Sequence, residues 1–251
     1  KQISIMGVSY SPKTVTDGLI FNIDAANPRS YVSGSTTIYG LEGEYSGSLN
    51  GGEFSNSSSG CWELDGVNDY LNFSQTSTGS FTSSFDPQLD SFNCFFEIDS
   101  NISDTGMIIG KGNRGSGNIG WSIWYSPASE KVYVRCNGND TVSQRAGQNI
   151  PINEDQIYMV TLVIDRTNNV ILGYLDGSNN NWIDGGGGGP LDNDITGFNS
   201  IIIEKKLLIG TRSDWSLDMY GNFYLAQIYN KALTSTEVQQ NYNALKHRFG
   251  L

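Results

Sequence analysis

The stretch from Leu207 to Tyr242 constrains the fold most, because its hydrophobic period changes partway along. Leu207–Gly210 is a short apolar run closed by a glycine. Asn222–Tyr229 is a longer run that is apolar on both faces, as expected for a strand inside a packed sheet. The polar residues Thr211–Tyr220 between the two runs predict a loop. This part of the stretch therefore predicts a strand, a loop and a second strand.

A helix is predicted directly after the second strand. Thr234 with Glu237 three positions later forms a capping-box pattern, the signature of a helix N-terminus. Val238, Tyr242 and Leu245 follow at the spacing of one helical face, and a glycine lies just past the end. The chain is therefore expected to close with one short helix.

Short apolar runs separated by Gly, Ser and Asn turns recur along the rest of the chain, whereas Ala25–Gly60 predicts a long loop with short strand pieces. About a dozen strands and a single terminal helix predict an all-β sandwich of two antiparallel sheets. The clearest predicted strands are Leu19–Asp24, Ser91–Ile98, Met107–Gly110, Gly120–Ser126 and Lys131–Arg135, with a hairpin of Ile157–Asp165 and Val170–Asp176.

Four segments resemble laminin-G-like domains, which are jelly-roll sandwiches of the concanavalin-A-like lectin-glucanase superfamily. They are LDGVNDYLNF within Cys61–Phe73, the hairpin that starts at Ile157, LLIG at Leu207, and IYNKALTSTEVQQNY from Ile228. The resemblance implies one concanavalin-A-like jelly roll over residues 17–251, preceded by an N-terminal lead-in of residues 1–16. The fold by itself does not define a function, because it hosts lectins, receptors, hydrolases and scaffolds.

The first and last segments of the matching region resemble a narrower group of proteins. The opening DGLIFNIDAANPRSY and the ending ALKHRFGL resemble laminin-G-like proteins encoded by tailed phages of aquatic bacteria. Such proteins decorate heads, tails or fibres, so this likeness implies a virion surface protein.

Charge and hydropathy exclude two classes of partner. The formal net charge is −11, and no cluster of Lys and Arg offers a site for a phosphate backbone. The sequence therefore predicts no nucleic-acid binding, and no run of 18 apolar residues predicts membrane insertion. Cys61, Cys94 and Cys136 form neither a metal motif nor a disulfide framework, so we expect buried thiols and assembly in a reducing compartment.

Catalytic motifs are incomplete. A glycosidase of this fold would carry two Glu residues around an Asp on one strand, because two carboxylates are required across the sugar bond. Glu97-Ile98-Asp99 begins such a motif, but no second Glu follows. His247 is the only histidine, and no nucleophile elbow accompanies it. The sequence-based prediction is that the chain is not an enzyme, with a glycoside hydrolase as the least favoured alternative.

Two tryptophans in polar loops predict carbohydrate binding. Trp182 is flanked by Asn180 and Trp215 by Arg212 and Asp214. Exposed aromatic rings can stack on the apolar face of a sugar, while amide, carboxylate and guanidinium groups bond its hydroxyls. In the alternative, each Trp folds back as a loop anchor, because Trp is highly buried on average.

Calcium is the one possible cofactor, and no cofactor is certain. The resemblance to pentraxin-type relatives would place acidic ligands in Thr211–Tyr220, which implies Asp214 and Asp218, with Asn113 and Asn118 opposite. The segment that holds these two asparagines has no carboxylate, a departure that weakens the analogy.

The preferred sequence-based function is therefore a non-enzymatic virion surface protein, either a decoration, fibre or tail component. It would be assembled in the host cytoplasm, displayed as an oligomer or in many copies, and bound to other virion proteins, to cell-surface glycans, or to both. The alternative is an extracellular bacterial module, secreted or on the cell surface, for carbohydrate binding or adhesion.

Overall fold

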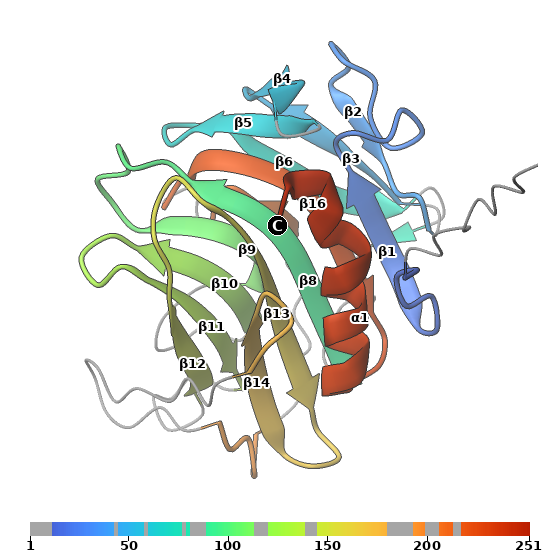
Figure 1. Ribbon diagram of the computed structural model, residues 1–251, viewed down its shortest axis with the longest axis vertical. Coiled ribbons are helices and arrows are strands. Elements are labelled where there is room, and N and C mark those ends of the chain that lie inside the picture. The colour runs from blue at the N-terminus through green and yellow to red at the C-terminus, as the bar shows by residue number, and fades with distance from the viewer. Residues whose placement is uncertain are drawn as a thin grey trace, which may run out of the picture.

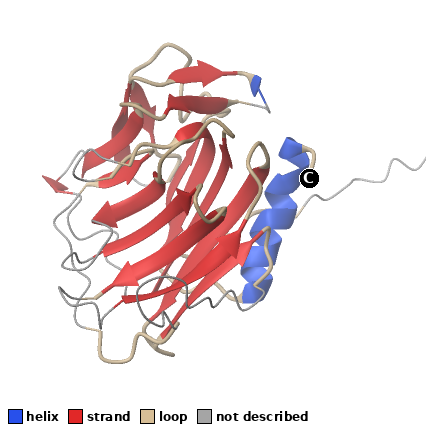
Figure 2. Ribbon diagram, turned by 90° about the vertical axis from the view of Figure 1, so that its left-hand side faces the viewer, coloured by secondary structure: helices blue, strands red, loops and turns tan. Residues whose placement is uncertain are grey.

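Two antiparallel sheets packed face to face form the body of the chain, and one helix lies against the outer face of one of them (Figures 1 and 2). The computed structural model describes residues 12–42, 45–57, 60–76, 79–80, 89–112, 120–138, 145–179, 193–198, 206–212 and 217–251. This architecture confirms the predicted all-β jelly-roll sandwich with a short C-terminal helix.

The seven-stranded sheet has the strand order β14-β13-β8-β16-β5-β4, with β1 also paired to β16. Its central strand β16 pairs with β8 along one side, while β5 and β1 share the other side. The strands are β1 (Leu19–Asp24), β4 (Glu53–Ser55), β5 (Cys61–Asp65), β8 (Leu89–Ile98), β13 (Ile157–Asp165), β14 (Val170–Leu175) and β16 (Tyr220–Tyr229).

The nine-stranded sheet has the order β12-β11-β10-β9-β15-β6-β3-β2, with β7 paired to β6. Its strands come in runs of one to four along the chain, interleaved with strands of the other sheet, so the chain crosses repeatedly between the two layers. The strands are β2 (Thr37–Tyr39), β3 (Tyr45–Asn50), β6 (Tyr70–Thr76), β7 (Gly79–Ser80), β9 (Gly106–Gly112), β10 (Gly120–Ser126), β11 (Lys131–Asn137), β12 (Arg145–Pro151) and β15 (Leu207–Ile209).

The main core lies between the sheets and is rich in aromatic rings. Phe92 of β8 stacks on Trp121 of β10 at a centroid distance of 3.7 Å, which joins the two layers. Phe21 meets Phe73 edge to face at 5.1 Å. Such ring pairs add about 0.5–1.5 kcal/mol each beyond the area that they bury.

The strand β13 shows why the seven-stranded sheet needs cover on both faces. Alternate residues such as Val160 and Leu162 enter the core between the sheets, whereas Met159 and Val163 point to the opposite face. A second cluster forms there beneath the helix, with Val238 of α1 fully buried.

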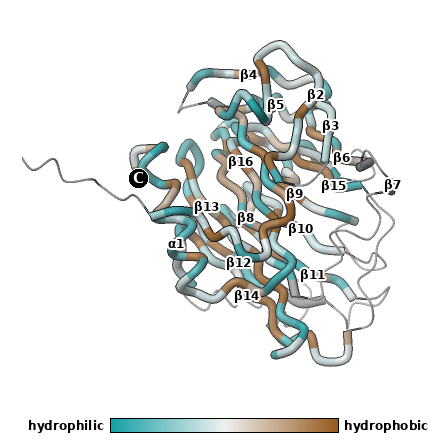
Figure 3. Tube along the Cα trace, turned by 90° about the vertical axis from the view of Figure 1, so that its right-hand side faces the viewer, coloured by the Kyte–Doolittle hydropathy of each residue, from teal (hydrophilic) through white to brown (hydrophobic). Residues whose placement is uncertain are grey.

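The closing helix α1 (Ser235–Leu245) is followed by a 3-10 turn η3 (Lys246–Phe249). Thr234 is the N-cap, and the predicted capping box with Glu237 is present. In η3, Phe249 stacks on Phe95 at 4.7 Å, so the turn holds the C-terminal end of the helical region on the sheet. Figure 3 shows hydrophobic residues concentrated along the strands, whereas α1 is largely hydrophilic outside its contact with the sheet.

Several local predictions are confirmed and others need correction. The Ile157–Asp165 and Val170–Asp176 hairpin is present as β13 and β14. Val67 lies at the tip of the turn between β5 and β6 and is 68% exposed. Those two strands enter different sheets, so no partner closes over this side chain. The strand β12 was not predicted, because its sequence RAGQNIP has few β-forming residues.

The three cysteines are free and buried, as expected. Burial raises the pKa of the Cys61 thiol to about 11 and that of Cys136 to about 12, so neither forms a reactive thiolate at neutral pH. Among the described residues, no helix combines the length and the apolar character needed to cross a membrane.

Candidate functional site

Most of the predicted site residues cannot be placed. Arg212 and Asp218 belong to the described part of the chain, at the two ends of the loop between β15 and β16. The others lie outside the described residues, namely Asn113, Asn118, Asn180, Trp182, Asp214 and Trp215.

Asp218 lies at a rim of the sandwich that also holds Asp65 and Asp69 from the turn between β5 and β6. Burial raises the pKa of Asp218, the nearby Thr211 hydroxyl opposes this shift, and the charges of the other two carboxylates raise the pKa further. Sequence reasoning selected Asp218 but not its two acidic neighbours. We call these three carboxylates the acidic rim.

The other two rim carboxylates are already engaged with the backbone. Asp65 accepts a hydrogen bond of 2.9 Å from the N–H of Val67, an Asx turn that shapes the Asp-Gly corner. Asp69 accepts one of 3.1 Å from the N–H of Asp65. Within the described ranges, no group of three or more His, Cys, Asp or Glu side chains is placed to hold a metal ion. The calcium site stays a prediction.

The two polar loops that contain the predicted sugar-binding residues, Asn179–Gly189 and Thr211–Tyr220, start from separate parts of the sandwich. We call them the predicted recognition loops. Asn179 follows β14 at one edge of the seven-stranded sheet, whereas Asp218 lies beside the turn after β5. Four strand spacings separate β14 from β5 in the sheet order, or about 19 Å. The described ends of the loops are thus not brought together.

A second candidate site lies beside the turn that follows β14. It is an open groove of about 680 Å³ between α1, the turn after β14 and the N-terminal segment. Of the nine described lining residues, seven carry a neutral amide or hydroxyl group and none is charged. We call this the amide groove; its lining is Pro12, Gly177, Ser178, Asn179, Ser235, Thr236, Gln239, Gln240 and Asn243.

The turn Gly177–Asn179 forms one wall and is held close to the helix. Leu175 and Ser178 exchange backbone hydrogen bonds of 2.9 Å, which close the turn. Gly177 has φ +81°, and a Cβ there would lie 2.9 Å from Nε2 of Gln239. Glycine is therefore required both for the backbone conformation and for the close approach. Asn179 Nδ2 donates to the carbonyl of Gly173 at 2.8 Å, which fixes the end of the wall.

The second wall is the polar face of α1. The residues at positions 235, 236, 239, 240 and 243 share one side of the helix, because each turn takes 3.6 residues. Opposite them, Val238 and Asn241 are buried against the sheet. The helix therefore covers the second core with one face and presents amides with the other.

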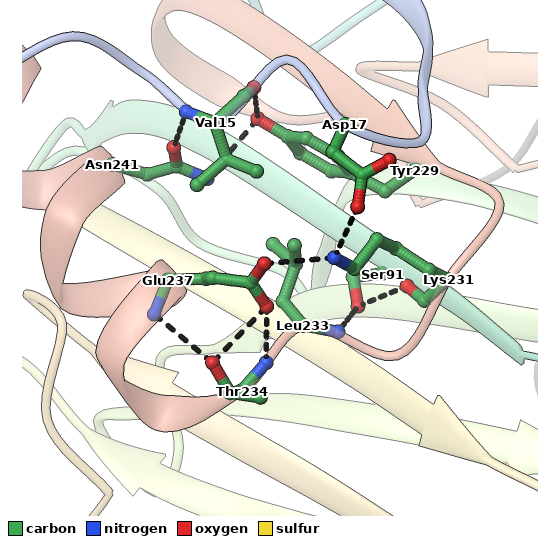
Figure 4. A network of polar contacts seen from close by, with 9 residues as sticks. All are labelled: Val15, Asp17, Ser91, Tyr229, Lys231, Leu233, Thr234, Glu237 and Asn241. Carbon is green, nitrogen blue, oxygen red and sulfur yellow. Dashed lines mark hydrogen bonds and ion pairs between the residues drawn. The ribbon is translucent and has the colours of Figure 1, made fainter.

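The N-terminal segment completes the groove and is fastened to α1 through polar contacts (Figure 4). Asn241 accepts a hydrogen bond from the N–H of Val15 at 2.8 Å, and Tyr229 donates its hydroxyl to the carbonyl of the same residue at 3.1 Å. Lys231 binds both Asp17 and Glu237, at 2.8 and 2.7 Å. Residues 12–16 of the predicted lead-in thus pack on the sandwich; the domain boundary itself stays a prediction.

The lining side chains divide into two groups. Asn179 and Gln240 are committed to backbone carbonyls, the latter to that of Lys13 at 2.7 Å, and they hold the walls in place. Gln239 and Asn243 donate to no side chain or backbone group in the described part of the chain. Each free amide offers donors and an acceptor, the combination that a sugar hydroxyl needs. The groove can therefore bind a hydroxyl-rich ligand through hydrogen bonds.

Sequence reasoning did not find the helical part of this groove. The signal present in the sequence is the amide run at Gln239–Asn243, which is unusual on a helix of 11 residues. One of its members, Asn241, points inward instead, and only the packing of α1 separates it from the others.

The catalytic candidates of the sequence are held in other contacts. Glu97 on β8 accepts hydrogen bonds from the Tyr224 hydroxyl at 2.7 Å and from the Asn222 amide at 3.0 Å. Asp99 accepts from the backbone N–H of Asn101 at 2.8 Å. These hydrogen bonds give both carboxylates a structural role at the end of β8.

The described fold and groove define the chain as a concanavalin-A-like β-sandwich with a polar groove beside its helix. No protein-family model matches the sequence, and no curated protein matches it. Solved structures do match. Trypanosoma rangeli sialidase in complex with sialic acid aligns with a TM-score of 0.63 and 13% identity, over 92% of this chain and 33% of the sialidase chain.

A second match is the binding domain of botulinum neurotoxin serotype G, with a TM-score of 0.62 and 14% identity. It covers 89% of this chain and 50% of the neurotoxin chain. The chain thus spans a third to a half of the structures that it matches, and at this identity the likeness shows the shared fold.

The likeness to sialidases corrects one prediction. The sequence was interpreted as non-enzymatic because Glu97 lacks a second carboxylate, yet chains of the same fold include enzymes. A missing motif excludes only the reaction that uses that motif, so the fold is compatible with enzymatic activity. Nothing in these matches is specific to phage proteins.

Proposed function

We propose that this chain is a glycan-binding β-sandwich module that holds a saccharide in the amide groove. One observation carries the proposal: the helix α1 and the turn Gly177–Asn179 direct uncommitted amides and hydroxyls into one groove. Hydrogen bonds tie Asn179 to β14 and Gln240 to the N-terminal segment, so the backbone that carries the free groups is held in place before a ligand arrives. Such preorganisation reduces the entropy cost of binding.

The shared fold supports the same proposal. Trypanosoma rangeli sialidase, which has a similar β-sandwich, is seen in complex with sialic acid. The groove is lined by Asn179, which directly precedes in sequence the polar segment that contains Trp182. The site of display, a virion surface or a bacterial exterior, stays a prediction in both of its forms.

A glycan array tests the proposal. The chain would be coupled to multivalent particles, because a single shallow site of this kind is expected to bind at about millimolar strength. The parent should retain a subset of glycans, and the double variant Gln239→Ala/Asn243→Ala should lose them. Both side chains are partly exposed, so the variant should unfold at the same temperature as the parent.

Arg212→Ala is the matched control, because Arg212 belongs to the other predicted recognition loop. Loss of binding in the groove variant, with retention in Arg212→Ala, supports the groove. Loss only in Arg212→Ala would move the site to the acidic rim and refute the groove. A parent that binds no glycan would refute the proposed function.

A further inference from the structure

We infer that the saccharide bound in the amide groove is neutral and carries no carboxylate or sulfate; this rests on the proposed function. The inference follows from the described lining residues, which are four amides, three hydroxyls, one proline and one glycine, with no Lys, Arg or His among them. Recognition of an anionic sugar normally uses a cation, above all the bidentate guanidinium of Arg.

Three described lysines lie close to the groove in sequence, but none of them is among its described lining residues. Lys231 near the start of α1 binds Asp17 and Glu237. Near the end of the helix, the Lys246 ammonium lies over the Tyr242 ring at 5.3 Å from its centroid. Lys13 directly follows Pro12 and takes part through its backbone carbonyl, which accepts a hydrogen bond from Gln240. An anionic ligand would therefore find no cation within the described lining.

A negative charge borders the groove instead. Asp176 immediately precedes the Gly177 wall, and its Oδ1 accepts a hydrogen bond from the N–H of Met159 at 2.9 Å, which fixes its position. The charge of Glu237 on α1 is offset by its ion pair with Lys231. The whole chain carries a formal net charge of −11. An anionic sugar would be repelled both locally and at long range, whereas a neutral one is unaffected.

The same lining favours a polyol over a peptide. Peptide grooves contain apolar pockets for anchor side chains, whereas Pro12 and Gly177 are the only residues of the described lining without a polar side chain. A neutral pyranose presents several hydroxyls, each able to donate and accept, and so matches the free amides of Gln239 and Asn243.

The test compares two forms of one oligosaccharide, neutral and capped with sialic acid, by titration of the multivalent chain at low and at physiological ionic strength. The neutral form should bind at least about tenfold more tightly, and its affinity should not change with salt, because no ion pair is formed. Gln239→Lys places a cation in the groove and should shift the preference towards the capped form at low salt. Gln239→Met, of similar size but without charge, is its control and should not create that preference.

The outcomes separate this inference from the proposed function. Equal or tighter binding of the capped form by the parent would overturn the neutral-ligand inference while leaving glycan binding intact. Binding of neither form, together with an empty glycan array, would overturn both. Neutral binding that survives Gln239→Ala/Asn243→Ala would show that the ligand lies outside the groove, and would also refute the inference.

Discussion

The side chain of Asn241 accepts a hydrogen bond of 2.8 Å from the backbone N–H of Val15, which lies 226 positions earlier in the chain. Its amide nitrogen also donates to the Tyr229 hydroxyl at 3.1 Å, and all of these groups are buried. One amide thus ties the N-terminal segment and the closing helix to the same strand (Figure 4).

Removal of this amide should destabilise the fold. In Asn241→Ala, the N–H of Val15 would lose its acceptor in a buried setting, at a cost of about 1–3 kcal/mol in the free energy of unfolding. The exposed Thr236 on the same helix is the control, and Thr236→Ala should change that free energy by less than about 0.5 kcal/mol. Urea denaturation measures both; equal stability of the two variants would show that the bond contributes nothing.

The N-cap provides a second stability prediction. The Thr234 hydroxyl accepts from the backbone N–H of Glu237, one of the four donors that the helix cannot satisfy internally. Thr234→Ala should lower the free energy of unfolding by about 0.5–2 kcal/mol, and Thr234→Ser should restore most of it. An unchanged denaturation midpoint in the alanine variant would mean that this cap is not used in solution.

The Glu237 carboxylate makes the cap sensitive to acid. Burial acts to raise its pKa, but the Lys231 ammonium and two hydrogen bonds with Thr234 together hold the pKa below its usual 4.5. A carboxyl whose folded-state pKa is lowered adds stability above its usual pKa, and this stability is lost as the pH falls through the folded value. The gap between the parent and Glu237→Gln in thermal melts should therefore be full at neutral pH and close below about pH 4.5. A gap that persists in acid would contradict this assignment.

Asp218 should show the opposite pH dependence. Its pKa is raised above the usual 3.8 by burial and by the neighbouring charges of Asp65 and Asp69. A group whose folded pKa is raised in this way destabilises the fold once it ionises. Asp218→Asn should therefore raise the melting temperature at neutral pH, and the gain should disappear as the pH falls through the raised pKa towards 3.8.

Calcium tests the same carboxylate in another way. If the predicted calcium site includes Asp218, a bound ion would offset the repulsion between Asp218 and the carboxylates of Asp65 and Asp69. Calcium should then raise the melting temperature of the parent. Asp218→Asn should then lose the response to calcium, while Glu63→Gln, an exposed acid on β5, should keep it. No calcium shift in the parent would remove the calcium prediction and leave the acidic rim as a source of charge repulsion.

The two tryptophans of the predicted recognition loops give the last prediction. A Trp face that packs on a sugar ring is expected to add about 1–3 kcal/mol to binding. If Trp182 and Trp215 both contact the glycan, Trp182→Ala/Trp215→Ala should weaken binding of multivalent particles to the array by more than about tenfold. A double variant that folds and binds like the parent would show that these residues are loop anchors.

Local physics explains why part of this structure could be predicted from the sequence. The capping box at Thr234 involves atoms three residues apart, so its pattern specifies the start of α1 without help from the rest of the chain. The alternation in Ile157–Asp165 likewise assigns each side chain to one face of a strand. These signals sufficed for the fold class, the hairpin and the closing helix.

Other features depend on contacts between distant residues. The segments on either side of Asp65-Gly66 resemble a hairpin in sequence, yet β5 and β6 enter different sheets, because packing of the two layers decides where the chain crosses. Asp218 meets Asp65 only in the folded chain.

The amide groove depends on tertiary structure in the same way. It combines Pro12, the turn at Gly177 and the face of α1 that contains Gln239, and no local pattern links these three segments. By itself, the sequence determined the main strands other than β12, and the closing helix, because side-chain periodicity and capping act within a few residues. Only the tertiary structure decided which amides face solvent together, because burial of the opposite helix face against the seven-stranded sheet sets the rotation of α1.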